Sequence, residues 1–461
     1  MRIKELLGQP ESKVLEFKRD MSSLSPIIKT IIAFANTAGG ILIIGRNSEG
    51  QIIGLTDIFK AEEQLANAIA DNIQPALVPD IEIATVDNKD LLVVKVNYWK
   101  APFFYKKEGI PNGIYIRLGS TSRPAGPELT AELQRSVTST SYDQSPIPSL
   151  SIDDLDFSYI KKIYRSKHDH FNEKKLVSLG ILAPFGNRYV PTVGGVILFG
   201  KEEVRSQYVP DAKVDCARFL GTTKAKILDR LQIKASVLDA IEEVNKFISR
   251  NTRLEAEIRS FQRKDIPEYP KVGIREALIN AIAHADYSLL GSRIKIAIFS
   301  DRLEIENPGM FPFGYTMDDF IAGISKARNR VIVRTLNEIG FMEEWGSGYK
   351  RIHEFCKEQD YPNPKWEEFG AALRVTFYPF GTGHYISENS ISMITQNLSE
   401  RERLILSLFQ IGDTLPFKDI YSKLTITISE RMLRYNLVEL AKKGVLISEG
   451  KGRNAAWKRI K

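Results

Sequence analysis

The stretch GIREALINAIAHADYS, residues 273–288, decides how the rest of the chain is interpreted. Its apolar residues recur with the period of an amphipathic helix, and four of them can face a core: Ala277, Leu278, Ile282 and Ala283. Glu276, Asn280 and His284 follow one another at intervals of one helical turn, so they project from the same side. Such a polar stripe is typical either of a functional helix face or of an incidental polar ladder on a surface helix.

A hairpin and a glycine-rich turn follow this helix. The segments RIKIAIF (293–299) and LEIEN (303–307) are predicted strands joined by a tight SDR turn, and Pro308-Gly309 ends the second strand. Glu-Trp-Gly-Ser-Gly (344–348) then precedes another predicted helix. This order suits a nucleotide held between a polar helix face and free backbone N–H groups.

Three segments together resemble the divergent GHKL ATP-binding fold found at the C-terminal end of RecG-like proteins: REALINAIAHADYS, SDRLEIENPG and GFMEEWGSGYKRI. The resemblance covers roughly residues 265–380 and implies an α/β sandwich with ATP and Mg²⁺ as cofactors. It makes Asn280 the residue that coordinates Mg²⁺ through the phosphates, and Glu276 the residue that orients or deprotonates the attacking water. His284 and Gly309 belong to the same candidate nucleotide-binding set.

The resemblance also implies an adenine-reading position and a phosphate-side loop. Glu306 or Asn307 would stand at the adenine position, and Gly346 and Gly348 would form the loop. This sequence departs from the family there, because it has ENPG in place of an Asp-x-Gly-x-Gly pattern, and its second glycine motif is short. We therefore expect nucleotide binding with, at most, weak ATP hydrolysis.

Length and composition indicate an ordinary globular protein of about three domains. The 461 residues include only two cysteines, Cys216 and Cys356, which are too few for a disulfide framework or a cysteine-rich zinc site. The start, MRIKELLGQPESK, lacks the apolar core of a signal peptide, and no apolar run approaches the roughly 18 residues of a membrane span. We therefore expect a cytoplasmic protein without a membrane partner.

The positive charge is concentrated at the C-terminal end. Of the net charge of +7, about +6 lies in residues 399–461, where 13 Lys and Arg face 7 Asp and Glu. Such a distribution indicates a domain that faces an anionic polymer such as DNA. The alternative is a solvated basic tail.

Residues 1–135 alternate helical and strand patterns, with ESKVLEFK (11–18) read as a strand that buries Val14 and with Phe17 as a second candidate for burial. ESKVLEFK, AFANTAGGILIIG and YIRLGSTSRPA follow one another in the order of the Schlafen AlbA domain, a nucleic-acid-associated α+β module that they resemble. This resemblance implies nucleic-acid contact, for which Arg117 and Arg123 are candidates. The segment YWKAPFFYKK (98–107) interleaves rings and ammonium groups that suit bases and phosphates, or else supplies core aromatics from an edge strand.

Some Schlafen proteins are ribonucleases with a metal-binding carboxylate cluster, so nuclease activity is the alternative function. Glu11, Glu16 and Lys18 match two acids and the lysine of that cluster. A phosphodiester-cutting metal site needs more carboxylate charge, yet Arg46-Asn47-Ser48 occupies the place of the third acid. We therefore expect Glu11 and Glu16 to be a structural or binding pair.

Residues 136–152 are rich in Ser, Thr and Pro and are predicted to be a linker, followed by a connecting or oligomerisation region at 153–264. Gly195 to Lys201 fits the G-x₄-G-K spacing of a P-loop, but Glu202 stands where Ser or Thr should bind Mg²⁺. The residues VILF in between read as a core strand. We therefore reject a P-loop helicase.

A second predicted linker, 381–397, leads to residues 398–461, which read as three helices and a basic β-ribbon. This pattern resembles the winged helix-turn-helix domains of bacterial regulators. The resemblance places three side chains of the third helix near base edges and two of the ribbon near phosphate: Ser429, Arg431 and Arg434, and Lys451 and Arg453. The alternative is a protein-binding winged helix.

Together these features predict an α+β multidomain protein: a Schlafen AlbA domain, a divergent GHKL-like nucleotide-binding domain at 265–380 and a winged helix. The same three modules are found in bacterial ATP-binding transcriptional regulators with a Schlafen AlbA domain, which the chain resembles. We expect an ATP-responsive DNA-binding regulator that forms a homodimer or higher homo-oligomer. The alternatives are a Schlafen-like nuclease that acts in defence against foreign nucleic acid, and a nucleotide domain that survives only as a dimerisation scaffold.

Overall fold

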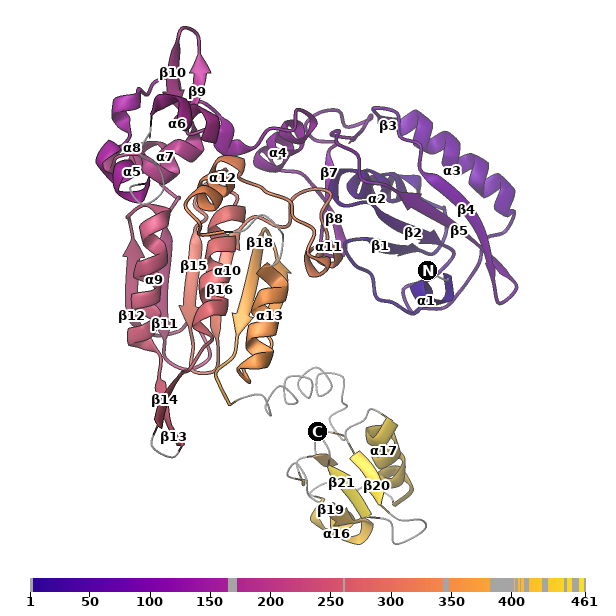
Figure 1. The fold of residues 1–461 in the computed structure, drawn as a ribbon. Helices are drawn as coiled ribbons and strands as arrows, with labels where there is room; N and C mark the ends of the chain where they lie inside the picture. The colour runs from indigo at the N-terminus through magenta and orange to yellow at the C-terminus, as the bar shows by residue number, and fades with distance from the viewer. Residues whose placement is uncertain are drawn as a thin grey trace. The chain divides into compact units, whose positions relative to one another are not determined.

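The computed structural model describes residues 3–164, 172–259, 262–342 and 348–381, together with these C-terminal residues: 402, 405–406, 408–409, 414–424, 430–442, 446–449 and 456–459. It divides into two compact units, one comprising Met1–Gln359 and Asn363–Tyr378, the other Asp360–Pro362 and Pro379–Lys461. Figure 1 shows the order of the elements along the chain. No helix in the described part of the chain is both long and apolar enough to cross a membrane.

The N-terminal part of the first unit is an α+β domain around a four-stranded sheet of order β1-β2-β5-β4, in which only β1 and β2 run parallel. Its helices are α1 (Ile3–Leu7), α2 (Leu24–Thr37) and α3 (Ile58–Asn72), and its strands are β1 (Leu15–Lys18), β2 (Gly40–Ile44), β3 (Ile73–Gln74), β4 (Asp80–Val86), β5 (Lys89–Val96), β6 (Phe104–Tyr105), β7 (Tyr115–Leu118) and β8 (Thr121–Pro124). The α2 helix is buried along most of its length because it packs against the sheet and the β7–β8 hairpin.

Two details of this domain differ from the sequence-based prediction. Val14 is 36% exposed, contrary to the prediction, whereas Leu15, Glu16 and Phe17 are all buried, so both faces of the strand are covered. The sequence pattern predicts Ser25, before Pro26, as the N-cap of the α2 helix, but the helix begins at Leu24, with Ser23 at the N-cap position. Within 98–107, Phe103 and Tyr105 are core residues, and Trp99 is exposed.

A small helical region follows, containing α4 (Pro127–Val137), η1 (Tyr142–Gln144), η2 (Ile152–Asp154), α5 (Phe157–Tyr164), α6 (Glu173–Leu179), the hairpin β9 (Leu182–Phe185) and β10 (Arg188–Pro191), α7 (Val193–Phe199) and α8 (Glu202–Tyr208). The predicted core strand VILF is wrong: these residues form α7, whose residues are all buried. The predicted linker 136–152 is also packed rather than free, because Asp143 is fully buried and accepts hydrogen bonds from the N–H groups of Val331 (2.7 Å) and Ile332 (3.0 Å).

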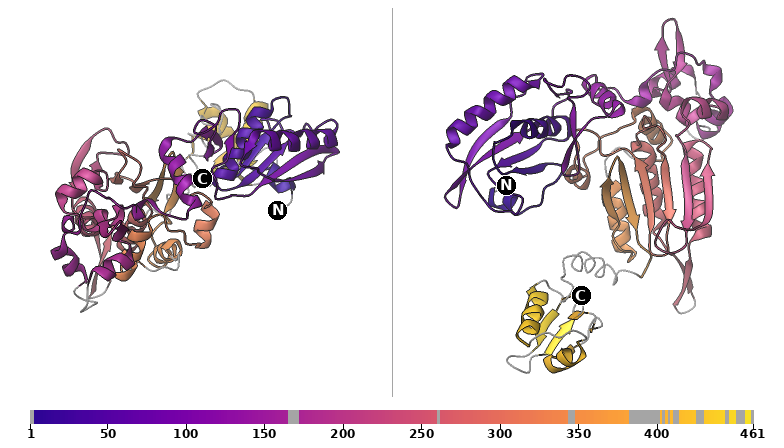
Figure 2. Two further views of the ribbon diagram at one scale, coloured as in Figure 1. Left: turned by 90° about the horizontal axis from the view of Figure 1, so that it is seen from above. Right: turned by 180° about the vertical axis from the view of Figure 1, so that it is seen from behind.

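The largest sheet has six strands in the order β12-β11-β15-β16-β18-β17, and only β11 and β15 are parallel. Its strands are β11 (Val214–Phe219), β12 (Ile227–Ile233), β15 (Ile294–Ile298), β16 (Leu303–Pro308), β17 (Lys365–Phe369) and β18 (Ala372–Phe377). The helices α9 (Val237–Asn251), α10 (Lys271–His284) and α13 (Gly348–Glu358) lie on one face, and the view from behind in Figure 2 shows the strands in front of them. Around this sandwich lie the hairpin β13 (Leu254–Arg259) and β14 (Gln262–Pro267), and the helices α11 (Met317–Ala322) and α12 (Arg330–Glu338).

This sheet corrects the prediction of a separate connecting region at 153–264. Residues 214–233 supply β11 and β12, and β11 pairs directly with β15, so the sandwich begins some fifty residues earlier than the sequence pattern indicates. The α10 helix lies over β16, with Ala277, Leu278 and Ile282 buried as expected.

The second unit contains β19 (Thr414–Pro416), α16 (Phe417–Lys423), α17 (Glu430–Lys442), β20 (Leu446–Glu449) and β21 (Ala456–Arg459). The strands form a sheet of order β19-β21-β20. The side chains that the helical pattern predicts to point inward, Leu433, Leu437 and Leu440, are fully buried in a core with Phe417 and Trp457. Strand β19 was not predicted.

Candidate nucleotide-binding site

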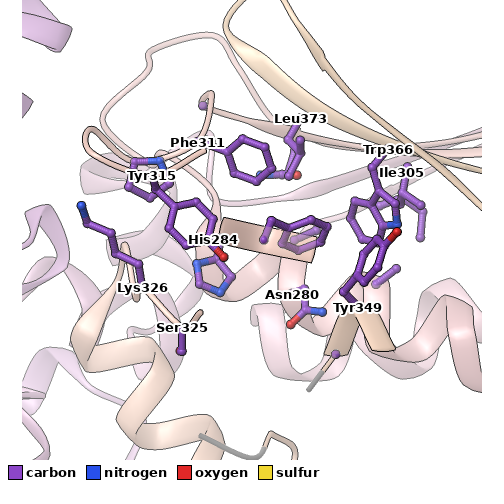
Figure 3. Close-up of a pocket in the computed structure, with 18 of the residues that line it drawn as sticks. Asn280, His284, Ile305, Phe311, Tyr315, Ser325, Lys326, Tyr349, Trp366 and Leu373 are labelled. Carbon is purple, nitrogen blue, oxygen red and sulfur yellow. The ribbon is translucent and has the colours of Figure 1, made fainter. Parts of the chain in front are cut away.

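A cavity of about 910 Å³, including the solvent at its mouth, opens beside α10 in the first unit (Figure 3). Four parts of the chain supply its walls: α10, the end of β16, the segment from Met310 to Lys326, and the start of α13 with β17 and β18.

The polar stripe of α10 lines this cavity with Glu276, Asn280 and His284. The three side chains share one wall because they are spaced four residues apart, while Leu278 and Ile282 on the other faces are buried in the core. Nη2 of Arg351 donates a hydrogen bond to Glu276 Oε2 (3.2 Å), so the carboxylate is held by a cation on α13.

Gly348, the first residue of α13, lies directly against this stripe. A Cβ at this position would be 2.8 Å from Asn280 Nδ2 and 3.0 Å from Glu276 Oε1. A Cβ at 2.8 Å would force the Asn280 amide to shift, so glycine allows α13 to begin at the two polar groups without displacing them. The structure therefore brings Gly348 together with Glu276 and Asn280, whereas Gly346 lies outside the described residues.

Strand β16 separates the two candidates for the adenine position. Ile305 and Asn307 line the cavity, while Glu306 points to the opposite face of the sheet, as the two-residue period of a strand requires. There the Glu306 carboxylate accepts a hydrogen bond from Arg374 (3.0 Å) and forms an ion pair with Lys295 (3.4 Å). Glu306 is therefore excluded from the cavity wall, and Asn307 remains. Gly309 also lines the wall, with a φ of +95° that favours glycine.

His284 lies in the last turn of α10 and lines the cavity. Burial, and after it the charge of Arg328, lowers the pKa of His284 to about 4. Burial also raises the pKa of Tyr315, which lines the same cavity, to about 12. Both rings are therefore neutral near pH 7, and the hydroxyl group of Tyr315 donates its hydrogen bond to the carbonyl oxygen of Ile324 (2.5 Å).

Aromatic rings form a wall that the sequence pattern did not reveal. Phe320 is at its centre, with ring centroids 5.5 Å from Phe311, 5.1 Å from Tyr349 and 4.8 Å from Trp366. All four rings line the cavity, and Figure 3 shows Tyr349 and Trp366 side by side across from Tyr315. Flat apolar surfaces of this kind suit a planar heterocycle, since rings gain stacking energy in addition to burial.

Lys326 is a further lining residue that no pattern in the sequence indicates. Its ammonium group donates a hydrogen bond to the carbonyl oxygen of Phe313, and its side chain lines the cavity. Burial, and then the nearby charge of Lys100, lowers the pKa of Lys326 below its usual range. A partly buried ammonium group that also faces a like charge is a good counterion for a ligand phosphate.

Within the described residues, no group of three or more His, Cys, Asp or Glu could hold a metal ion. The cavity offers the oxygens of Asn280 and Glu276 on one wall. Mg²⁺ keeps several waters and is commonly bound through one or two protein groups and the substrate phosphates. The donor set therefore fits Mg²⁺ that arrives with a nucleotide, and does not form a cage of its own.

The acidic pair of the N-terminal domain is engaged internally. Glu16 is buried and forms ion pairs with Lys18 (2.5 Å) and Arg117 (3.0 Å), and Glu11 accepts a hydrogen bond from the N–H of Phe17 (3.1 Å). Arg117 is only 1% exposed, so the prediction that it contacts DNA is wrong: its guanidinium group is used inside the domain. Arg123 on β8 is exposed, as a nucleic-acid contact requires.

The predicted DNA-binding residues of the second unit are only partly described. Arg434 on α17 lies 4.0 Å from the ring centroid of Phe417 and forms an ion pair with Glu430 (3.7 Å), with its side chain 43% exposed. Arg431 lies on the same helix, but its side chain is not described. Three of the predicted residues lie outside the described part of the chain: Ser429, Lys451 and Arg453.

Comparisons with known proteins identify two regions. The family model "Schlafen, AlbA_2" matches residues 11–126, and the model "Putative ATP-dependent DNA helicase recG C-terminal" matches residues 291–377. No curated protein matches the chain significantly.

Two similar solved structures cover different shares of the chain. The DIP2311 protein from Corynebacterium diphtheriae is 19% identical over 99% of this chain and 96% of its own, with a TM-score of 0.45. The N-terminal domain of a RecG-related protein from Nitrosomonas europaea is 33% identical over 27% of this chain and 95% of its own, with a TM-score of 0.22. The two family matches show that this chain joins a Schlafen AlbA_2 region to a region of the RecG-like C-terminal HATPase type.

Proposed function

We propose that the protein binds ATP in the cavity beside α10 and that the bound nucleotide changes its affinity for DNA. The observation that carries the proposal is the cavity wall itself, where Glu276 and Asn280 lie within one site that also contains Lys326 and an aromatic surface. The match of residues 291–377 to an ATPase-type family model, and of residues 11–126 to a Schlafen AlbA_2 model, supports a nucleotide-dependent, nucleic-acid-associated protein.

Each wall has a role in this proposal. Asn280 contributes an oxygen to Mg²⁺ on the phosphates, Lys326 supplies positive charge to them, and Asn307 reads the base, which packs on the aromatic wall. Glu276 is the group placed to orient a water molecule. Since Arg351 already holds its carboxylate, we propose that hydrolysis is slow and that binding is the main event.

A polar link connects this cavity with the N-terminal domain. Glu368 Oε1 accepts one hydrogen bond from the N–H of Phe311 (2.8 Å) and another from Nζ of Lys13 (2.8 Å). Phe311 lines the cavity, and Lys13 lies two residues before β1. A nucleotide that moves Phe311 therefore changes the surroundings of Lys13, which gives ATP a direct contact route to the Schlafen-like domain.

DNA binding is assigned to the second unit and to exposed Arg123. The two helices and three-stranded sheet of this unit support a winged helix, in which α17 is the recognition helix and the β20–β21 ribbon is the wing. Ser429, Arg431 and Arg434 would then approach base edges, with Lys451 and Arg453 at phosphate. We further propose a homodimer or higher oligomer that regulates transcription, because operators are commonly read by two-fold assemblies.

The test has two steps. A fluorescent ATP analogue is titrated into the wild-type protein, the Asn280→Ala variant and, as a matched control, Asn187→Ala in the exposed β9–β10 turn. We expect the Asn280 variant to bind at least about tenfold more weakly, because a charged ligand loses a direct contact. DNA binding is then measured with and without ATP. Equal, negligible binding of the analogue by all three proteins would favour a scaffold that no longer binds nucleotide.

The nuclease alternative has less support. It needs a third acid near Glu11 and Glu16, and the position after β2 is occupied by Arg46, whose guanidinium group lies 3.8 Å from the ring centroid of Phe17. Incubation of labelled RNA and DNA with the protein and Mn²⁺ separates the two functions. Cleavage that disappears in Glu16→Gln, with the fold retained, would replace the regulator proposal.

A further inference from the structure

A second cavity, of about 730 Å³ including the solvent at its mouth, shares Pro312 and Lys326 with the first. Its walls come from the C-terminal end of α4, the turn at residues 139–142, the segment after β5 and residues 326–330. It therefore lies where the Schlafen-like domain and the ATPase-like domain meet, within the first compact unit.

Positive charge dominates this second cavity. Five cationic side chains line it, against the two acids Glu132 and Asp286, which leaves a formal charge of +3: Lys100, Arg135, Lys326, Arg328 and Arg330. Arg328 forms ion pairs with both acids, at 2.8 Å to Glu132 and 3.1 Å to Asp286. In the described part of the chain, the other four cations form no ion pair, so their charge is available to a ligand.

Neutral hydrogen-bonding groups accompany these cations. Ser136, Ser139, Thr140 and Ser141 line the cavity, and Lys100 Nζ donates a hydrogen bond to Ser139 Oγ (3.3 Å). The hydroxyl groups of Ser136 and Ser141 donate to the carbonyl oxygen of Leu133 (2.6 Å) and to Asp143 (2.5 Å), so they face a ligand as acceptors of the cations' hydrogen bonds or not at all. Ser139 has a φ of 55°, in the left-handed region that side chains other than glycine rarely adopt. This conformation is usual just after the end of a helix, where the N–H groups of Ser139 and Thr140 donate to the carbonyl oxygens of Ser136 (3.2 Å) and Arg135 (3.2 Å), and the resulting turn places the Ser139 hydroxyl group next to the ammonium group.

We propose that this second cavity binds a phosphate group, with Lys100 and Arg135 as its principal ligands and Lys326 shared with the nucleotide cavity. A phosphate carries more negative charge than a carboxylate and has several acceptor oxygens, so it matches the excess of cations. The phosphate belongs either to a small phosphorylated compound or to a nucleic-acid backbone that crosses the junction of the two domains. This site goes beyond the proposed ATP site, because Lys100 and Arg135 do not line the first cavity.

Binding of two probes to the full chain tests the proposal. Inorganic pyrophosphate is titrated by calorimetry, and a fluorescein-labelled single-stranded oligonucleotide by anisotropy. The test variant is Lys100→Gln/Arg135→Gln, which keeps polar side chains, and the charge-matched control is Lys60→Gln/Lys357→Gln on exposed helix positions outside both cavities. Thermal unfolding confirms that each variant is folded.

We expect the affinity of at least one probe to fall by about tenfold or more in the test variant and to be unchanged in the control. A loss for the oligonucleotide identifies a nucleic-acid backbone, and a loss for pyrophosphate alone identifies a small phosphorylated compound. Equal affinity of the test variant and the control for both probes overturns the proposal, as does the absence of binding to the wild-type protein. The fluorescent ATP analogue reports separately on the first cavity, so failure of one site is distinguishable from failure of the other.

Discussion

At the residue scale, one methyl group added at Gly348 should weaken nucleotide binding without lowering the stability of the fold. An added methyl group would lie 2.8 Å from Asn280 Nδ2, so the amide must move, whereas alanine suits the backbone of a helix start. We expect Gly348→Ala to weaken binding of the ATP analogue about tenfold while the free energy of unfolding stays equal or rises by up to about 1 kcal/mol. Gly126→Ala, where the nearest atom would be Glu128 Oε2 at 3.5 Å, is the control and should leave binding unchanged. Unchanged binding in both variants would remove Asn280 from the site.

The pKa of His284 predicts a pH dependence of stability. This pKa is lowered to about 4 by burial and by Arg328, while that of an unfolded histidine is near 6.5. Between these two values the unfolded chain binds more protons than the folded chain. The free energy of unfolding therefore rises with pH over this range, by at most about 1.4 kcal/mol per pH unit. This contribution to stability disappears as the pH falls towards 4.

The measurement is urea unfolding of the wild-type protein and His284→Gln at several pH values from 4.5 to 8. The variant should show a flatter slope below pH 6.5, and the two slopes should coincide above pH 7.5, where the histidine is neutral in both states. Parallel slopes over the whole range would show that His284 is accessible to protons in the folded protein.

At the scale of secondary-structure elements, α12 depends on an acid far away in the sequence. Asp143 is fully buried and caps the first N–H groups of α12 at Val331 and Ile332. Asp143→Ala leaves these donors without a partner, and we expect it to lower the free energy of unfolding by about 2–4 kcal/mol. Asp143→Asn keeps an acceptor oxygen and should lose less than half as much. Thermal or urea unfolding measures both variants, and equal losses would mean that the charge of Asp143, and not its acceptor geometry, stabilises α12.

The elements that were predicted correctly are those whose pattern is local. The helix around Asn280 shows both an apolar face and a polar stripe, so its period is sufficient to place it. By contrast, β11 was assigned to a connecting region because nothing in its own residues says that it pairs with β15, about eighty residues later. The apolar residues 196–199 are buried on all sides in α7, and such a run has no polar face to distinguish a helix from a strand.

The same reasoning explains how much of the site could be predicted. Helical spacing predicts that Glu276, Asn280 and His284 lie together. The two-residue period of a strand predicts that only one of Glu306 and Asn307 faces the cavity, but it does not say which one. Lys326 and the aromatic wall come from a segment without periodicity, so only the tertiary fold brings them to α10. Arg117 was interpreted as a surface cation because its burial depends on Glu16, about one hundred residues earlier.

At the scale of the whole molecule, communication between the ATP cavity and the N-terminal domain should depend on Lys13. Its ammonium group donates hydrogen bonds to both carboxylate oxygens of Glu368, at 2.8 and 3.0 Å. The same carboxylate accepts a hydrogen bond from the N–H of Phe311, which lies in the cavity wall. Lys13→Met keeps most of the side chain but removes the charge, so Glu368 can still hold Phe311. We expect this variant to bind ATP and DNA separately within about threefold of the wild type, yet to lose most of the effect of one ligand on the other.

The readout is DNA affinity with and without saturating ATP, since a coupling of about 1–3 kcal/mol appears as a change of about 5–150-fold in the wild-type protein. Lys4→Met is the control, because Lys4 also lies in the N-terminal domain and makes an exposed ion pair with Asp87 at 3.8 Å, far from Glu368 in the chain. If Lys13→Met and Lys4→Met both keep the wild-type ratio of affinities, the Glu368 contact is only structural. Because coupling is reciprocal, the same variant must also lose the effect of DNA on ATP binding, and a loss in one direction alone would contradict a two-state linkage.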